Sequence, residues 1–385
     1  MAHFSIPEHI VVGCGAIKEA LPYLKRYGKR ALIVTGKHVG KSPMMDSLVA
    51  ALRFIQAESF VFDEITGEPT DEMITRGCKM YQEHRCDYVI GIGGGSPLDS
   101  AKAIAAMVVN IGNISDYMGK EIEGNIPPIV AIPTTAGTGS EATKFTVITD
   151  SKKGIKMLLK GEKLIPKLAI VDPDYTIDMP KSITAATGFD ALTHAIEAYT
   201  SKKAMCLTDS YALSAIQRIV KYLPVAYQNG YDGQAREQMA IAALEAGICI
   251  NNSSVTIVHG MSRPIGAMFH VPHGLSNAML LRECMVFAMQ DHYERFADIA
   301  RAIGAANNAE SDTSAAEKLI DVIDTLRRSC EIPTLCSYGI SEEVYMAVVN
   351  KMANDAIASG SPGNTRREVT VADCSSLYIR AYRKN

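Results

Sequence analysis

A β-type apolar run that ends in consecutive glycines constrains the fold of this chain most. Residues 88–92 form the run, and Gly93, Gly94 and Gly95 follow it. Pro97, favoured in a first helical turn, then opens an alanine-rich helical segment. A tight turn alone would need fewer glycines. Glycines without side chains leave the backbone amides at the start of the helix open, and such amides bind a pyrophosphate well. The residues that we expect to contact a dinucleotide here are Gly93, Gly94, Gly95, Ser96 and Asp99.

A second loop of small and hydroxyl-bearing residues follows another apolar run. It reads Pro-Thr-Thr-Ala-Gly-Thr-Gly-Ser-Glu over residues 133–141. Such residues let a ribose or a phosphate approach the backbone closely. We interpret this loop as the opposite side of a dinucleotide cleft. Its expected cofactor-binding residues are Thr134, Thr135, Thr138 and Thr143.

The organisation of the chain changes near residue 180. Before it, β-type runs alternate with helical stretches, which is typical of an open α/β sheet. These runs are residues 31–35, 88–92, 129–132 and 168–171. After it, alanine, methionine and leucine recur at helical spacing. We expect a Rossmann-like dinucleotide-binding α/β domain over residues 1–180, an all-α metal-binding domain over residues 181–385, and an active site in the cleft between them.

Four potential metal ligands lie in two short segments of the second half. Asp190 and His194 are four residues apart, so a helix would present both from one face. His259 and His273 lie in the other segment. Three imidazole nitrogens and one carboxylate oxygen suit iron(II) or zinc better than calcium or magnesium, and they predict Lewis-acid chemistry on a substrate oxygen. We interpret Glu197 as an exposed helix acid rather than a further ligand.

Composition excludes several classes of protein. The net charge is only −3, and no basic run forms a stripe that would bind nucleic acid. Neither a signal-peptide pattern nor an apolar run of membrane-spanning length is present, so we expect a cytoplasmic protein without a membrane partner. The 9 cysteines are scattered without a Cys-x-x-Cys pair, which indicates reduced thiols rather than disulfides or a thiolate zinc site.

The wording and order of these motifs closely resemble the iron-containing (group III) alcohol dehydrogenase family. The resemblance extends to Val-Thr-Val-Ala-Asp at residues 369–373, essentially the whole chain. It implies hydride transfer between NAD(P)(H) and a short or medium primary alcohol or aldehyde. It also implies a homodimer or higher homo-oligomer, and a bound Fe²⁺ or Zn²⁺. The metal ligands that it implies are Asp190, His194, His259 and His273.

One position departs from the family pattern. Many members carry a second histidine four residues after the ligand that corresponds to His259, and this chain has Arg263 there. A guanidinium cannot act as a base near neutral pH. The proton path is therefore expected to use His270, with bound water or direct exchange with solvent as alternatives. The other interpretation of Arg263 is a structural ion pair.

The residues after the first β-type run bear on the choice of cofactor. NAD-preferring relatives often carry an acid here that binds the ribose 2′-hydroxyl, whereas this chain has Gly36, with Lys37 and Lys41 nearby. No carboxylate would repel a 2′-phosphate and the lysines could pair with it, so we expect NADP rather than NAD. In the alternative, both lysines are solvated and NAD binds through the other loops. The resemblance adds Phe145 and Lys156 to the cofactor-binding residues.

Other functions fit the same architecture less well. A lyase or cyclase of the dehydroquinate-synthase type would need several basic residues around a phosphorylated substrate, and only Arg263 lies inside a ligand segment. A polyol oxidoreductase resembling glycerol dehydrogenase is a further alternative. A non-catalytic metal-binding protein is disfavoured because all four ligands and both loops are present. The resemblance places Phe145, Thr146 and Ile250 around the substrate, and these predict primary alcohols and aldehydes rather than acids.

Overall fold

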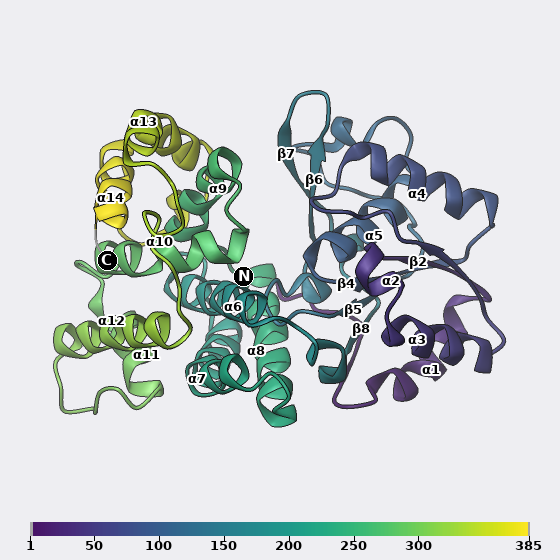
Figure 1. Ribbon diagram of the computed structural model, residues 1–385, viewed down its shortest axis with the longest axis horizontal. Helices are drawn as coiled ribbons and strands as arrows, with labels where there is room; N and C mark the ends of the chain where they lie inside the picture. The colour runs from purple at the N-terminus through teal and green to yellow at the C-terminus, as the bar shows by residue number, and fades with distance from the viewer. Residues whose placement is uncertain (1–2, 384–385) are drawn as a thin grey trace. The chain divides into compact units, whose positions relative to one another are not determined.

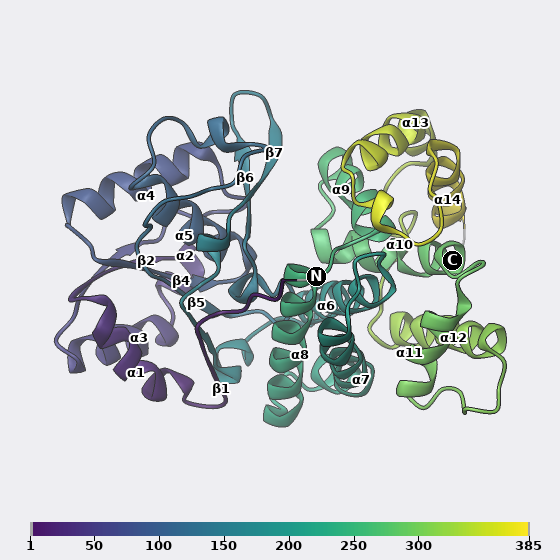
Figure 2. The same ribbon diagram turned by 180° about the vertical axis from the view of Figure 1, so that it is seen from behind.

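The computed structural model describes residues 3–383, which divide into two compact units (Figures 1 and 2). The first, here called the sheet unit, spans Phe4–Met179, and the second, the helical unit, begins at Pro180. The predicted fold class is confirmed, because an open parallel sheet lies in the first unit and a set of helices forms the second. An active site in a cleft between them stays a prediction.

The sheet unit is built on six parallel strands in the order β1-β8-β5-β4-β2-β3. The strands are β1 (His9–Val12), β2 (Arg30–Val34), β3 (Glu58–Phe62), β4 (Tyr88–Gly93), β5 (Ile129–Pro133) and β8 (Leu168–Val171). Both β4 and β5 are buried at every position, as the continuous apolar runs of central parallel strands require. Strands β2 and β4 are neighbours in the sheet. The chain continues from β2 outward to β3 on one side, and from β4 to β5 on the other side. Ligands of open α/β sheets bind at the carboxyl ends of such a strand pair.

Alternate side chains of each strand enter two separate cores. Ile33 and Ile90 contribute to one face, which α1 (Ala16–Tyr27) and α3 (Pro43–Phe54) cover. Leu32 and Val89 contribute to the other face, which α4 (Asp71–Glu83) and α5 (Gly95–Met107) cover. The period of two along a strand therefore accounts for both layers of helices.

An antiparallel hairpin extends the sheet unit beyond the six strands. It pairs β6 (Phe145–Asp150) with β7 (Ile155–Lys160). Thr146 and Ile148 are fully buried on one face, whereas Val147 and Leu158 are opposite each other and exposed on the other. This hairpin was not predicted, because its lysines and glycine interrupt the β-type pattern.

Nine helices form the described part of the helical unit. They are α6 (Lys181–Thr200), α7 (Cys206–Gln228), α8 (Gly233–Asn252), α9 (Ile257–Phe269), α10 (His273–Ala288), α11 (Tyr293–Ala302), α12 (Asp312–Ser329), α13 (Glu342–Ala358) and α14 (Val371–Arg383). Helix α6 is buried at every residue from Gly188 to Thr200, because α7, α8 and α10 pack around it. No single helix of the described chain is long and apolar enough to span a membrane; α8 and α9 pass that test only as a pair bent by 104°.

The approach of α10 to α6 depends on a glycine. A Cβ atom at Gly274 would lie 2.2 Å from the carbonyl oxygen of Ala186 and 3.1 Å from Cβ of Asp190. Any side chain at this position would push the two helices apart, since the nearer atom belongs to the backbone.

Replacement of Gly274 by alanine should therefore destabilise the helical unit by about 1–3 kcal/mol, the usual cost of overpacking. The matched control is Gly233→Ala, because Gly233 begins α8 and a Cβ there would meet no atom within 4 Å. Thermal unfolding would compare the two variants. A midpoint for Gly274→Ala equal to that of the control would show that the helices can separate without cost.

Candidate metal and cofactor sites

Three helices bring the predicted metal ligands together. Asp190 and His194 lie one turn apart on α6, His259 lies on α9, and His273 begins α10. The Oδ1 atom of Asp190 is 3.6 Å from Nε2 of His259, 3.6 Å from Nε2 of His273 and 3.9 Å from Nε2 of His194. Donor atoms around a tetrahedral ion with bonds of about 2.1 Å are about 3.4 Å apart. Asp190, His259 and His273 are therefore close to the spacing that a cation needs, and His194 approaches Asp190 without joining that group. The four residues are here called the ligand cluster.

The ligand cluster is largely buried. Asp190, His194 and His259 are each at most 5% exposed, and the rings of His194 and His259 stack with centroids 4.5 Å apart. The side chain of His273 is 46% exposed, so it forms the open side of the cluster. One ligand atom each from Asp190, His259 and His273 lie within 4.8 Å of one another.

Two members of the cluster carry the protonation states that metal binding needs. Burial by itself raises the pKa of Asp190, but the imidazoles of His194, His273 and His259 outweigh it and hold the pKa well below its usual range. Desolvation of the part of the His273 ring that faces the cluster lowers its pKa although the side chain is 46% exposed, so this ring is neutral. A carboxylate and a neutral imidazole are the forms that bind metal. For His259, burial lowers the pKa, but the Glu197 and Asp190 carboxylates outweigh it and raise the pKa while no cation is bound.

Glu197 supports the cluster from behind, and its interpretation as an exposed helix acid is wrong. It is fully buried because α6 is covered on every side. Its Oε2 atom lies 2.5 Å from Nδ1 of His259. Its Oε1 atom accepts hydrogen bonds from Thr256 Oγ1 and Val258 N, both at 2.6 Å. A carboxylate on Nδ1 fixes the ring and directs the Nε2 lone pair toward the other ligands.

Asn277 marks the point on which the ligand atoms converge. Its Nδ2 atom donates to Asp190 Oδ1 at 2.7 Å, and it lies 3.2 Å and 3.4 Å from Nε2 of His259 and His273. Its Oδ1 atom is buried without a hydrogen-bond partner in the described part of the chain. The Asp190 oxygen and the two histidine nitrogens thus all face one N–H donor, and the same three atoms can instead face a cation. The donor set therefore fits a divalent metal.

Substitution of any member of the ligand cluster should remove the metal. Loss of a residue that hydrogen-bonds a metal ligand typically weakens metal binding by about 10- to 100-fold. We expect a larger loss of metal affinity in each of the variants Asp190→Asn, His194→Ala, His259→Ala and His273→Ala. Metal content per chain after gel filtration is the measurement. Any variant that keeps full occupancy would remove that residue from the ligand set.

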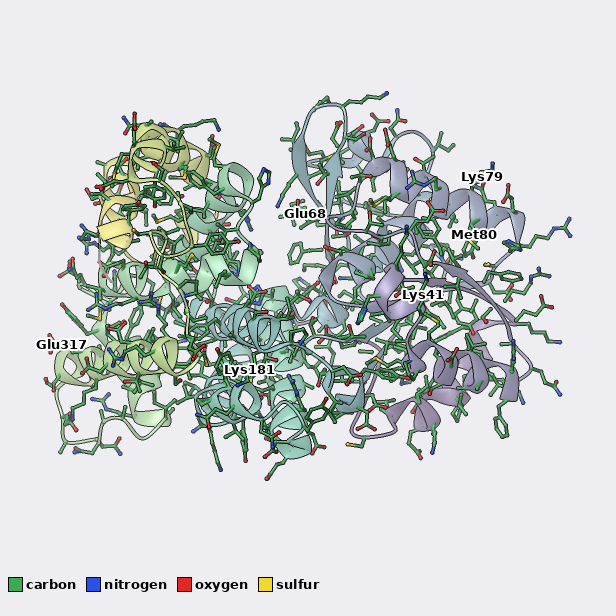
Figure 3. The ribbon with its side chains drawn as sticks, viewed as in Figure 1. Lys41, Glu68, Lys79, Met80, Lys181 and Glu317 are labelled. Atoms are coloured by element: carbon green, nitrogen blue, oxygen red, sulfur yellow. The ribbon has the colours of Figure 1, made fainter. Side chains whose placement is uncertain are left out.

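Glu197→Gln should weaken metal binding by about 10- to 100-fold, because a neutral amide no longer orients the His259 ring. Titration with a chelator of known affinity would measure this loss directly. Glu317→Gln is the matched control, since Glu317 is exposed on α12 (Figure 3). Equal metal affinity in both variants would show that Glu197 has no part in the site.

The two predicted cofactor loops lie side by side at the carboxyl ends of β4 and β5. Gly93 pairs with Pro133 in the sheet, and Thr134 N donates to Gly93 O at 2.9 Å. A Cβ atom at Gly95 would lie 3.0 Å from Cγ2 of Thr138. Helix α5 begins at Gly95, two residues before the expected Pro97. The amides of its first turn therefore face the threonine loop, where a phosphate can bind them.

A buried lysine that was not among the predicted site residues connects the two loops. Lys102 on α5 is fully buried, and its Nζ donates to Ser140 Oγ at 2.9 Å and to Thr143 Oγ1 at 3.0 Å. Ser140 Oγ in turn donates to Asp99 Oδ1 at 2.7 Å. Burial lowers the pKa of Lys102 to about 8, against the opposing effects of the Asp99 and Glu141 carboxylates. A lysine inside an alanine-rich helix was the available sequence signal.

This network changes what Asp99 does. Its Oδ2 atom accepts from Val147 N at 2.8 Å, so both carboxylate oxygens bind the protein itself. Asp99 thus holds β6 and the threonine loop, and its direct contact with a cofactor stays a prediction. Thr146 is also engaged, because its buried hydroxyl donates to Asp99 O at 2.8 Å. It does not line an open pocket, contrary to the expectation for a substrate wall.

The residues predicted around the adenosine ribose lie at the end of β2. Thr35 Oγ1 donates to Ile92 O at 2.8 Å, which joins this end to that of β4. Gly36 precedes the short helix α2 (Lys37–Gly40). Lys37 and Lys41 are exposed and form no ion pair with any described residue. Figure 3 labels Lys41. Both lysines are therefore available to an anionic ligand.

Of three other predicted residues, His270 and Lys156 lie apart from these groups, and Phe145 contacts the Lys102 network. His270 is exposed at the end of α9 in a left-handed conformation, and no described contact joins it to the ligand cluster, so its role in a proton path stays a prediction. Lys156 on β7 pairs with Glu68. Phe145 begins β6, and its carbonyl oxygen accepts from Lys102 Nζ at 2.9 Å.

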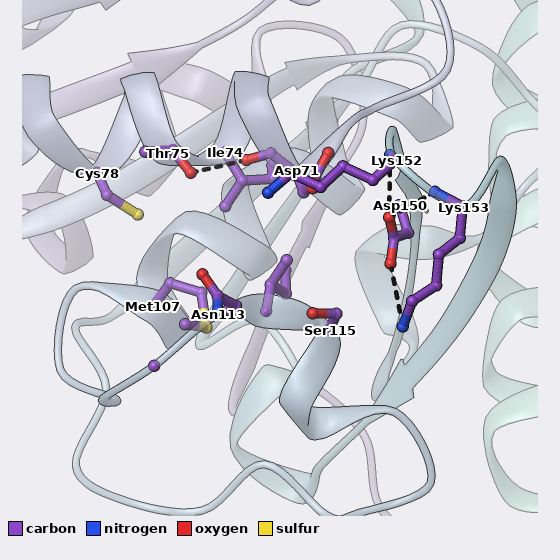
Figure 4. A pocket seen from close by; sticks show the side chains of 12 residues that line it. Asp71, Ile74, Thr75, Cys78, Met107, Asn113, Ser115, Asp150, Lys152 and Lys153 are labelled. Atoms are coloured by element: carbon purple, nitrogen blue, oxygen red, sulfur yellow. Dashed lines mark hydrogen bonds and ion pairs between the residues drawn. The ribbon is translucent and has the colours of Figure 1, made fainter.

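A separate cavity of about 350 Å³ lies in the sheet unit and contains none of the predicted site residues (Figure 4). Asp71, Cys78, Asn113 and Asp150 are among its lining residues. Asp150 Oδ1 accepts from the backbone amides of residues 152 and 153 at 3.0 Å. The acid therefore closes the hairpin turn, and the cavity has no assigned role.

Comparison with known proteins covers the whole chain. Residues 7–173 match the family model "Iron-containing alcohol dehydrogenase", and residues 184–382 match "Fe-containing alcohol dehydrogenase family, C-terminal". The NAD-dependent methanol dehydrogenase of Bacillus methanolicus is 37% identical over 99% of this chain and 100% of its own length. A crystal structure of 1,3-propanediol oxidoreductase superimposes with a TM-score of 0.96 at 34% identity, covering 99% of this chain and 100% of that one. The structure of sulfoacetaldehyde reductase from Bifidobacterium kashiwanohense in complex with NAD⁺ superimposes with a TM-score of 0.90 at 28% identity, covering 100% of both chains.

Proposed function

The chain belongs to the iron-containing alcohol dehydrogenase family, and on that premise we propose that its ligand cluster holds the catalytic metal. The protein is an alcohol dehydrogenase that uses a nicotinamide dinucleotide and a divalent metal. The observation that carries the proposal is the convergence of Asp190, His259 and His273 on one point, occupied by the Nδ2 atom of Asn277.

Each residue of the cluster has a physical task. A divalent metal bound there supplies Lewis acidity toward an alcohol or aldehyde oxygen, while the nicotinamide carries the hydride. Asp190 keeps its negative charge because three imidazoles surround it. Glu197 holds His259 in one orientation. In the sheet unit, Lys102 and Asp99 fix the threonine loop beside the first turn of α5, which we propose positions the pyrophosphate.

We propose a short primary alcohol or aldehyde as substrate. The three relatives named above are called after methanol, 1,3-propanediol and sulfoacetaldehyde, which have one to three carbon atoms. A lyase on a phosphorylated substrate is disfavoured, because Arg263 is the single basic residue within the two ligand segments. We also propose a cytoplasmic homo-oligomer, a dimer or larger. The nine free cysteines, five of them buried, support a reducing compartment.

Purification without air followed by metal analysis and an aldehyde panel would test this function. We expect about one iron or zinc ion per chain. We also expect oxidation of NADPH or NADH on addition of propanal or butanal, and loss of that activity in Asp190→Asn. A metal-loaded protein that oxidises neither cofactor with any aldehyde would disprove the proposal.

We expect the protein to accept NADPH, and Gly36→Asp to shift its preference toward NADH. The new carboxylate would repel a 2′-phosphate, at a cost on the order of 1–3 kcal/mol or about 5- to 150-fold in relative affinity. A Cβ at Gly36 would lie 2.8 Å from Ile65 O, so Gly36→Ala is the steric control. Dissociation constants of both cofactors are the measurement. A strong preference of the unmodified protein for NADH would show that Lys37 and Lys41 do not bind a phosphate.

A further inference from the structure

Arg263 lies beside the ligand cluster without an acidic partner. It follows His259 by four residues on α9, so the two side chains leave the same face of the helix. Its NH1 atom donates to Ser361 Oγ at 3.0 Å. No carboxylate within the described chain lies at ion-pair distance from it. The interpretation of Arg263 as a structural ion pair is therefore wrong.

The guanidinium acts on the cluster through its charge. Burial lowers the pKa of Arg263 and the Glu197 carboxylate opposes that effect, but an arginine keeps its proton throughout the physiological range. The side chain leaves α9 on the face that carries His259, one turn further along the helix, so its charge lies beside the ligand cluster.

The balance of charge around the cluster favours an additional anion. Asp190 and Glu197 supply two negative charges, whereas a divalent metal and Arg263 would supply three positive charges. A guanidinium has five N–H donors, and the described contacts of Arg263 use one NH1 group. A partly buried cation with free donors is costly unless an acceptor reaches it.

We propose that Arg263 is a specificity-determining residue that binds an oxyanion, a carboxylate or a sulfonate, at the far end of the substrate. The substrate would be a short aliphatic aldehyde or primary alcohol that carries this group. His259 and Arg263 are one turn apart on the same face of α9, so a short carbon chain joins a group at the cluster to one at the guanidinium. The proposal deepens the proposed function and depends on it.

The reaction itself is unchanged by the anionic group. The aldehyde carbon accepts a hydride from NAD(P)H and its oxygen accepts a proton, which gives the primary alcohol and NAD(P)⁺. The carboxylate or sulfonate keeps its charge and its bonds. The sequence expectation of an uncharged substrate rested on Phe145, Thr146 and Ile250, and Thr146 is buried with its hydroxyl bound to Asp99 O.

A matched pair of four-carbon aldehydes tests the proposal. We expect kcat/KM to be at least about tenfold higher for 4-oxobutanoate than for butanal, as charge-assisted hydrogen bonds allow. Arg263→Gln should lower this ratio by about 10- to 100-fold, mainly through KM, and Arg263→Lys should restore part of it. The control is Arg367→Gln, because Arg367 stacks on Phe287 elsewhere in the helical unit.

Equilibrium binding gives a second readout. Calorimetric titration of the metal-loaded protein should show tighter binding of 4-hydroxybutanoate than of 1,4-butanediol, and Arg263→Gln should abolish that difference. An equal ratio for unmodified protein and Arg263→Gln, in kinetics or in binding, would overturn the inference. If butanal is reduced without any preference for 4-oxobutanoate, the inference alone fails. If no aldehyde is reduced, the proposed function fails and the binding experiment still decides the role of Arg263.

Discussion

The burial of ionisable side chains on α6 is the constraint on which the helical unit depends. Asp190, His194 and Glu197 lie on a helix covered from Gly188 to Thr200, where water cannot solvate their charges. Each therefore needs a partner from another helix, because a buried charge without one is expensive. Glu197 forms hydrogen bonds with residues at the start of α9, and Asp190 accepts a hydrogen bond from Asn277 on α10. The contacts that stabilise the buried charges of Glu197 and Asp190 also bring the ligand atoms of α6, α9 and α10 together.

A comparable constraint organises the sheet unit. The ends of β2, β4 and β5 lie next to one another, since Thr35 bonds to Ile92 and Gly93 pairs with Pro133. Lys102 then binds four oxygen atoms of the following loop and strand, which leaves that loop little freedom. Rigid loops at the carboxyl ends of strands lose less entropy when a ligand binds. Lys102 thus positions the predicted cofactor-binding loop and need not itself contact the cofactor.

Much of both sites could be predicted from local patterns. The four-residue spacing of Asp190 and His194 is a helical period, and α6 confirms it. The glycine and threonine loops follow apolar strands that the structure pairs directly. Glu197 was misread, because a spacing along a helix does not reveal how many neighbours cover that helix. Lys102 and Asn277 were missed for the same reason, since their partners are distant in sequence.

The sequence by itself determined the central strands β2, β4, β5 and β8, the helical second half and the chemistry of the donor atoms, because periodicity and residue type are local properties. The tertiary structure alone decided which charges are paired. His259 gained a carboxylate on Nδ1, and Asp99 became a support of β6 and its loop. Arg263 donates a hydrogen bond to a hydroxyl, not to the acid that one of its two interpretations required. Such pairings depend on the packing of segments up to 98 residues apart, a distance over which no local pattern carries information.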